Sequence, residues 1–123
     1  MIDSYIPGDF VMLDKQIAMV LGIEYIGNKY TLGTVKNYLE GIEPKDIKPI
    51  EITPEILERN GWKKVFGKDI GMGSDYVFIS KENKPTIIME RGNFYHTLFG
   101  KTRLIYLHQL QHLLFGLGLK NLR

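Results

Sequence analysis

The sequence predicts an α+β protein in which an N-terminal SH3-like small β-barrel is followed by an antiparallel β-meander that a C-terminal helix covers. Three observations carry this prediction. Short apolar clusters interrupted by glycines fill the first fifty residues, a short capped helical segment follows, and leucines at helical spacing lie near the C-terminus. Many short strands with few helices are typical of the α+β class. We expect residues 1–52 to form a strand-rich SH3-like subdomain and residues 53–123 to form the rest.

Apolar clusters in the first half predict strands at residues 10–13, 17–23, 30–35 and 39–42, with further apolar positions at Ile47, Ile50 and Ile52. The pair Gly27-Asn28, between Tyr25-Ile26 and Tyr30, indicates a hairpin turn, because both residue types tolerate the positive φ that such turns need. An isolated hairpin is only marginally stable in water. These strands must therefore pair further or close on themselves, and a small barrel satisfies that requirement.

Residues 53–60 predict a connector helix of about two turns. Thr53 can cap it, Pro54 suits its first position, and Gly61 follows as a stop. We expect Ile56 and Leu57 to face inward. Trp62 comes directly after the stop, and we interpret it as a packing residue.

The second half predicts a flexible glycine-bearing loop at residues 67–74 and then three antiparallel strands, at residues 76–80, 86–90 and 94–99. A closing helix is expected from about Thr102 to Leu117. Its leucines recur at steps of three and four and form one apolar stripe; they are Leu104, Leu107, Leu110, Leu114 and Leu117.

The composition excludes several classes of protein. The 123 residues are 44% hydrophobic and 24% charged, so the chain as a whole is not intrinsically disordered. It contains no cysteine, which excludes disulfides and thiol catalysis. The first residues lack the basic and apolar regions of a secretory signal, and no apolar run is long enough to cross a membrane. We therefore expect a cytoplasmic protein that does not bind membranes.

Three histidines are the candidate metal ligands. His108 and His112 are four residues apart, so both project from one side of the expected helix, and His96 on the preceding strand is a third candidate. The motif lacks the glutamate of H-E-x-x-H, because Gln109 follows His108. The simpler interpretation makes His108, Gln111 and His112 a polar flank beside the leucines, so we expect no metal and no other cofactor.

The net charge is only +2, but the charged residues are unevenly distributed along the chain. Residues 1–61 carry six Lys/Arg and ten Asp/Glu, a net −4, whereas residues 62–123 carry ten and four, a net +6. A basic half with interleaved aromatic residues can bind nucleic acid, and the halves or two copies of the chain can also attract each other. The candidate nucleic-acid-binding residues are Lys63, Lys64, Lys81, Lys84, Arg91, Lys101, Arg103 and Tyr95.

Two segments carry a resemblance to a known group of proteins. ITPEILERNGWKK at residues 52–64 and LIYLHQLQHLLFGL at residues 104–117 resemble small uncharacterised proteins of gut Bacteroidales prophages and mobile elements, whose N-terminal stretch opens with a pattern like IPGDFVML. The chain departs from that pattern at Trp62, where Phe is common, and at His112, where Asn is common. The resemblance implies a mobile-element setting and supplies no catalytic or binding residue.

For function, we expect a non-enzymatic binding or adaptor protein of a prophage or mobile element, whose partner is another protein or a second copy of itself. No catalytic residue is predicted, because Ser4, Ser74 and Ser80 lack the context of a nucleophile elbow. Two alternatives remain open. One is nucleic-acid binding by the basic second half, and the other is a metal-dependent enzyme around the three histidines.

Overall fold

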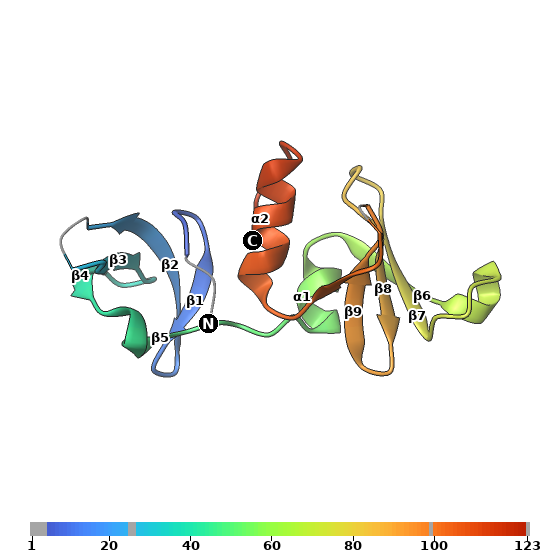
Figure 1. Ribbon diagram of the computed structural model, residues 1–123, viewed down its shortest axis with the longest axis horizontal. Helices are drawn as coiled ribbons and strands as arrows, with labels where there is room; N and C mark the ends of the chain where they lie inside the picture. Colours follow the sequence, from blue (N-terminus) through green and yellow to red (C-terminus); the bar gives the residue numbers. More distant parts are fainter. Residues whose placement is uncertain (1–4, 25–26, 99, 123) are drawn as a thin grey trace. The chain divides into compact units, whose positions relative to one another are not determined.

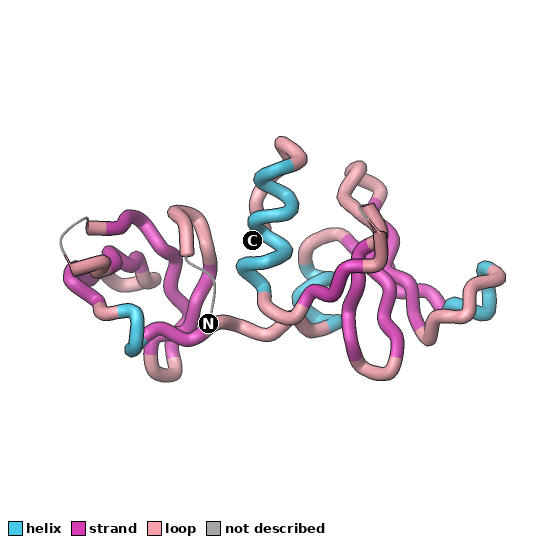
Figure 2. Tube along the Cα trace, in the orientation of Figure 1, coloured by secondary structure: helices cyan, strands magenta, loops and turns pink. Residues whose placement is uncertain are grey.

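The chain is α+β and separates into two compact units, residues 1–50 and 51–123. The computed structural model describes residues 5–24, 27–98 and 100–122. Each unit contains its own five-stranded antiparallel sheet, and the second unit also contains two α-helices (Figures 1 and 2). The division falls two residues before the boundary that the sequence predicts.

The first sheet has the strand order β4-β3-β2-β1-β5. Strands β4 and β5 are its two edges, so the described strands do not close into the expected barrel. Strand β5 is two residues long, because a 3₁₀ turn ends at Asp46 directly before it and Pro49 directly after it lacks the backbone N–H that a longer pairing needs. The elements are β1 (Phe10–Leu13), β2 (Gln16–Ile23), β3 (Tyr30–Gly33), β4 (Tyr38–Ile42), the 3₁₀ turn η1 (Pro44–Asp46) and β5 (Ile47–Lys48).

The inner face of this sheet forms the core of the first unit. Val11, Val20 and Leu32 are fully buried there, and Tyr5 packs edge-on against Tyr30 with ring centroids 5.8 Å apart. The β2–β3 loop contains the expected turn residues, since Gly27 and Asn28 both have positive φ. The flanking Tyr25 and Ile26 lie outside the described residues.

The second sheet has the order β10-β9-β8-β7-β6, five strands rather than the three expected. The sequence reading missed the two edge strands, β6 (Trp62–Phe66) and β10 (Thr102–Leu104). Phe99, expected at the end of the last strand, lies outside the described residues. The other elements are α1 (Pro54–Arg59), the 3₁₀ turn η2 (Gly67–Ile70), β7 (Tyr76–Ser80), β8 (Ile87–Glu90), β9 (Asn93–His96) and α2 (Leu107–Gly116).

The connector helix α1 and its packing residue are confirmed. Thr53 Oγ1 accepts a hydrogen bond from the Ile56 N–H at 3.3 Å, and Gly61 follows with φ +95°. Leu57 is fully buried, whereas Ile56 is half-buried. Trp62 is buried and donates its Nε1–H to the Pro85 carbonyl at 2.9 Å.

The closing helix begins five residues later than predicted. Thr102, expected at its start, instead pairs with His96 across β9 and β10. Gln109 then caps α2, because its Oε1 accepts hydrogen bonds from the Ile105 and Tyr106 N–H groups at 2.8 and 2.9 Å. The helix makes its main strand contact with the edge strand β10. No helix among residues 5–24, 27–98 and 100–122 is both long and apolar enough to cross a membrane.

The predicted leucine stripe is buried along most of its length. Leu104, Leu107, Leu110 and Leu114 are buried, but Leu117 is 40% exposed at the C-cap of α2. Leu117 therefore does not belong to the packed stripe.

Candidate functional site

The three candidate histidines do not meet around a common point. Within the described part of the chain, no three His, Cys, Asp or Glu side chains are grouped so that they could hold a metal ion. His108 is buried on α2, stacked on Tyr106 at 5.9 Å and edge-on to His112 at 5.6 Å. His96 is buried in β9, and its burial lowers its pKa from the ordinary value of 6.5.

The basic candidates sort onto two faces of the second sheet. Residues directly opposite each other in antiparallel strands share a face. The register places Tyr95 and Arg103 on one face together with Val77, while Lys64 lies on the other face with Phe78. We call the first of these the Tyr95 face. Across β6 to β10 it consists of Val65, Val77, Ile88, Tyr95 and Arg103. Lys63, two residues before Val65 on β6, shares this face, and Lys101 lies two residues before Arg103, directly before β10.

Two of the three cations of the Tyr95 face, Lys101 and Arg103, have partners on the protein. Lys101 Nζ lies 2.7 Å from Glu90 Oε1 and 4.7 Å from the centre of the Tyr95 ring. Arg103 Nη2 donates to Asn93 Oδ1 at 2.8 Å. A ligand anion at this face must compete with these contacts.

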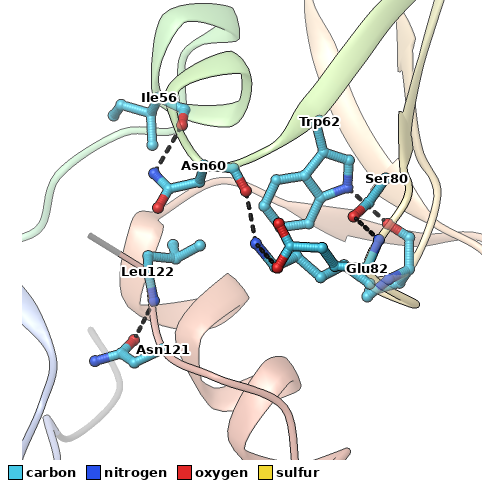
Figure 3. Close-up of polar contacts among 9 residues, drawn as sticks. Ile56, Asn60, Trp62, Ser80, Glu82, Asn121 and Leu122 are labelled. Carbon is cyan, nitrogen blue, oxygen red and sulfur yellow. Dashed lines mark hydrogen bonds and ion pairs between the residues drawn. The ribbon is translucent and has the colours of Figure 1, made fainter.

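Lys84 stabilises the fold and is not part of an exposed binding surface. Its side chain is only 9% exposed, its Nζ donates to the Asn60 carbonyl at 2.6 Å, and it lies 4.9 Å from the Trp62 ring centre. Figure 3 shows Asn60 and Trp62, two residues that Lys84 contacts. This contact ties the end of α1 to the turn between β7 and β8. Lys81 and Arg91 lie exposed in the two turns that flank β8.

A hollow of about 680 Å³ lies at the end of β6 and the start of β7, and the register places its residues Phe66 and Tyr76 on the opposite side of the sheet from Tyr95. We call it the Phe66–Tyr76 hollow. It is lined by Phe66, Lys68, Met72, Gly73, Ser74, Asp75 and Tyr76.

The loop that forms this hollow is held by its own backbone. Gly67 donates its N–H to the Asp75 carbonyl at 3.2 Å and accepts from the Met72 N–H at 2.8 Å. A Cβ at Gly67 would overlap the Ser74 carbonyl, so only glycine allows this close approach. The segment expected as a flexible loop therefore begins with a 3₁₀ turn, and Gly71 ends that turn with φ +72°.

Two lysines lie over the aromatic rings of the hollow. Lys64 Nζ is 4.4 Å from the centre of the Tyr76 ring, and Lys68 Nζ is 5.9 Å from that of Phe66. Among the described residues neither lysine has a carboxylate within ion-pairing distance. An exposed cation–π contact contributes only about 0.5–1 kcal/mol. Both ammonium groups can therefore move to an anion at small cost.

Lys64 was a predicted binding residue, whereas Phe66 and the hollow were not predicted from the sequence. The two rings pack at 5.3 Å, although ten residues separate them. Only the pairing of Phe66 with Tyr76 across β6 and β7 brings them together, and β6 was not predicted. A Trp-Lys-Lys-Val-Phe run with two exposed lysines was the available signal for an edge strand.

The outer face of the first sheet is apolar. Phe10 pairs with Met19, Met19 with Gly33, and Gly33 with Tyr38, so these positions form one row across four strands. Leu21 folds over Gly33, since its Cδ1 lies 3.1 Å from where a Cβ of Gly33 would be. We call this surface the outer apolar face; it consists of Phe10, Met12, Ile17, Met19, Leu21 and Tyr38.

The side chains of the outer apolar face are highly exposed for apolar residues. Ile17, Leu21 and Tyr38 are 57%, 49% and 63% exposed. The charged residues on it lie at its borders, Glu40 on β4 by strand alternation and Lys48 on β5 opposite Met12. A contiguous exposed apolar surface with a polar rim marks an interaction site.

Comparison with known proteins adds no relative. No protein family, no curated protein and no solved structure matches the chain. The two surfaces therefore have to be interpreted from their own chemistry.

Proposed function

We propose that the chain is a non-enzymatic binding module that assembles through the outer apolar face of its first unit, with a second copy of the chain as its partner. The observation that carries this proposal is the outer apolar face across β1 to β4, on which Ile17 and Tyr38 are both more than half exposed. A prophage or mobile-element setting accompanies the proposal, on the resemblance of residues 52–64 and 104–117.

We further propose that the first unit is an open variant of the SH3-like barrel. Its four-stranded meander with the fifth strand returning beside the first is the strand order of that fold, and a 3₁₀ turn precedes β5. Such small folds serve many different binding functions, so the fold supports a binding role without naming the partner.

The charged residues at the borders of the outer apolar face support a second copy of the chain as its partner. Lys48 and Glu40 lie at diagonally opposite corners of this face, since Lys48 is level with Met12 and Ile17 whereas Glu40 is level with Leu21. A two-fold axis in the plane of two stacked faces, perpendicular to the line from Lys48 to Glu40, brings the Lys48 corner of one copy over the Glu40 corner of the other. Lys48 then faces the partner's Glu40, and the same pair recurs on the other side. A stable interface needs about 800 Å² per partner, and six apolar residues form only its centre, so we expect a weak, concentration-dependent dimer.

The test is the solution mass of the full chain, measured by light scattering over a range of concentrations. The mass should rise from 14.2 kDa toward twice that value. Ile17→Asp should keep the chain monomeric, whereas Val35→Asp adds the same charge at a 96% exposed position off the face and should leave the dimer intact. A wild-type chain that stays monomeric at the highest concentration contradicts self-assembly.

Nucleic-acid binding by the second unit is a second candidate function. Residues 51–123 carry eleven Lys/Arg against seven Asp/Glu, and lysines lie over aromatic rings on both faces of the sheet. Phosphate contacts make such binding strongly dependent on salt. Labelled single- and double-stranded oligonucleotides should be bound at low salt and released as salt is raised, and the absence of binding at low salt would exclude this function.

A further inference from the structure

We infer that the Phe66–Tyr76 hollow is a stacking site for a base of single-stranded nucleic acid, with Lys64 and Lys68 as its phosphate contacts. This inference rests on the second candidate function and assigns it to one place on the second unit. It commits to single strands, because the bases of a duplex are stacked on each other and offer no free ring face.

The rings of the hollow are placed for stacking. Phe66 lies on the edge strand β6 and is 51% exposed, and Tyr76 beside it lines the same hollow. Each ring already holds a π-contact with a flexible ammonium group. Stacking of a base on an aromatic ring is stronger than an exposed cation–π contact. A base can therefore displace the ammonium group, which then reaches the phosphate of the same strand.

The acidic groups near the hollow do not prevent this arrangement. Asp75 lines the hollow, but its Oδ2 accepts a hydrogen bond from the Arg91 N–H at 2.9 Å. Asp69 lies exposed in η2. The Tyr95 face is the weaker candidate, because Lys101 and Arg103 are engaged by Glu90 and Asn93.

The experiment measures binding of the full chain to labelled single strands of roughly 10 nucleotides, DNA and RNA in separate arms, by fluorescence anisotropy. Phe66→Ala should weaken binding roughly 5- to 150-fold, the range expected for one stacked base. Phe66→Trp keeps a stacking ring and should retain binding. Lys64→Ala should lower the slope of log affinity against log salt by about 0.7, the loss of one phosphate contact on a single strand.

Tyr95→Ala is the matched control, because it removes an aromatic ring with a lysine above it from the opposite face. Weaker binding by Phe66→Ala with unchanged binding by Tyr95→Ala is the expected result. If Phe66→Ala binds like wild type while Tyr95→Ala does not, nucleic-acid binding stands and the hollow is the wrong site. If the wild-type chain binds no oligonucleotide, the candidate function fails together with the site. Sedimentation with anionic phospholipid vesicles in the absence of oligonucleotide binding would assign the hollow to a membrane surface instead.

Discussion

Truncation of Leu110 to alanine, compared with the same truncation of Leu117, separates a packed helix position from an exposed one. Leu110 is fully buried on α2, whereas Leu117 is 40% exposed at the end of that helix. The side chain lost is about three methylene equivalents, about 2.4 kcal/mol when fully buried. The cavity left at Leu110 adds to this loss, so we expect Leu110→Ala to lower the free energy of unfolding by about 3–4 kcal/mol. Leu117→Ala leaves no closed cavity and should cost about 1 kcal/mol.

Urea unfolding followed by tryptophan fluorescence measures this difference directly. Trp62 is the sole tryptophan of the chain and lies in the same unit as α2, so its signal reports the unfolding of that unit. The two losses differ by about 2–3 kcal/mol, so with a slope of about 1–3 kcal/mol per molar urea the two midpoints should differ by about 0.7–3 M. Equal losses at the two positions would refute the placement of the helix, because they would mean that Leu117 is as well packed as Leu110.

Three further perturbations test separate features of the second unit. Gly67→Ala should destabilise the second unit by about 2 kcal/mol or more, measured by thermal melts, because the added methyl overlaps the backbone of the loop. Gly73→Ala is the control and should be neutral, because a Cβ there meets no atom within 4 Å. Trp62→Phe leaves the buried Pro85 carbonyl without its donor and should cost about 2–4 kcal/mol by circular dichroism in urea; a loss below 1 kcal/mol would contradict this role. Burial lowers the pKa of His96, so the folded state binds fewer protons than the unfolded state and stability should fall as pH drops below about 6.5. His96→Leu should remove that part of the pH dependence, and an unchanged pH profile would contradict the effect.

The sequence predicts the first sheet better than the second. The strand at residues 10–13 is placed within its observed bounds, and the capped helix after Thr53 is placed to within a residue at each end. Both depend on local signals, namely apolar clusters between glycines and the pairing of a capping threonine with proline. The closing of the barrel depends on how far β5 can pair, and Pro49 directly after β5 was the available local signal against a longer strand.

The errors in the second unit have a common physical cause. The segment at residues 102–104 was assigned to the helix because Leu104 precedes Leu107 by three residues, a spacing that a short strand followed by a helix also produces. Three residues are too few to show a period of two. Strand β6 was not predicted because two of its five residues are lysines, which interrupt the apolar pattern of a strand. Both are edge strands, and each is stabilised by pairing with a single neighbour, β6 with β7 and β10 with β9.

The candidate surfaces could be predicted only in part. Charge asymmetry pointed to the second half, and the structure separates its basic residues into the Tyr95 face, the hollow, the turns and the buried Lys84. The outer apolar face was not foreseen, since its members come from β1, β2 and β4 and share a side only through the strand register.

The central claim is that the two units carry separate binding surfaces, an apolar face for self-assembly on the first and an aromatic, basic hollow on the second. Amide NMR spectra of the full chain, recorded against its own concentration and against a single-stranded oligonucleotide, test it most directly. Dilution should shift the amide signals around Ile17 and Leu21, and the oligonucleotide should shift those around Phe66 and Tyr76. Shifts spread evenly over both units in either titration, or no shifts at all, would contradict the claim.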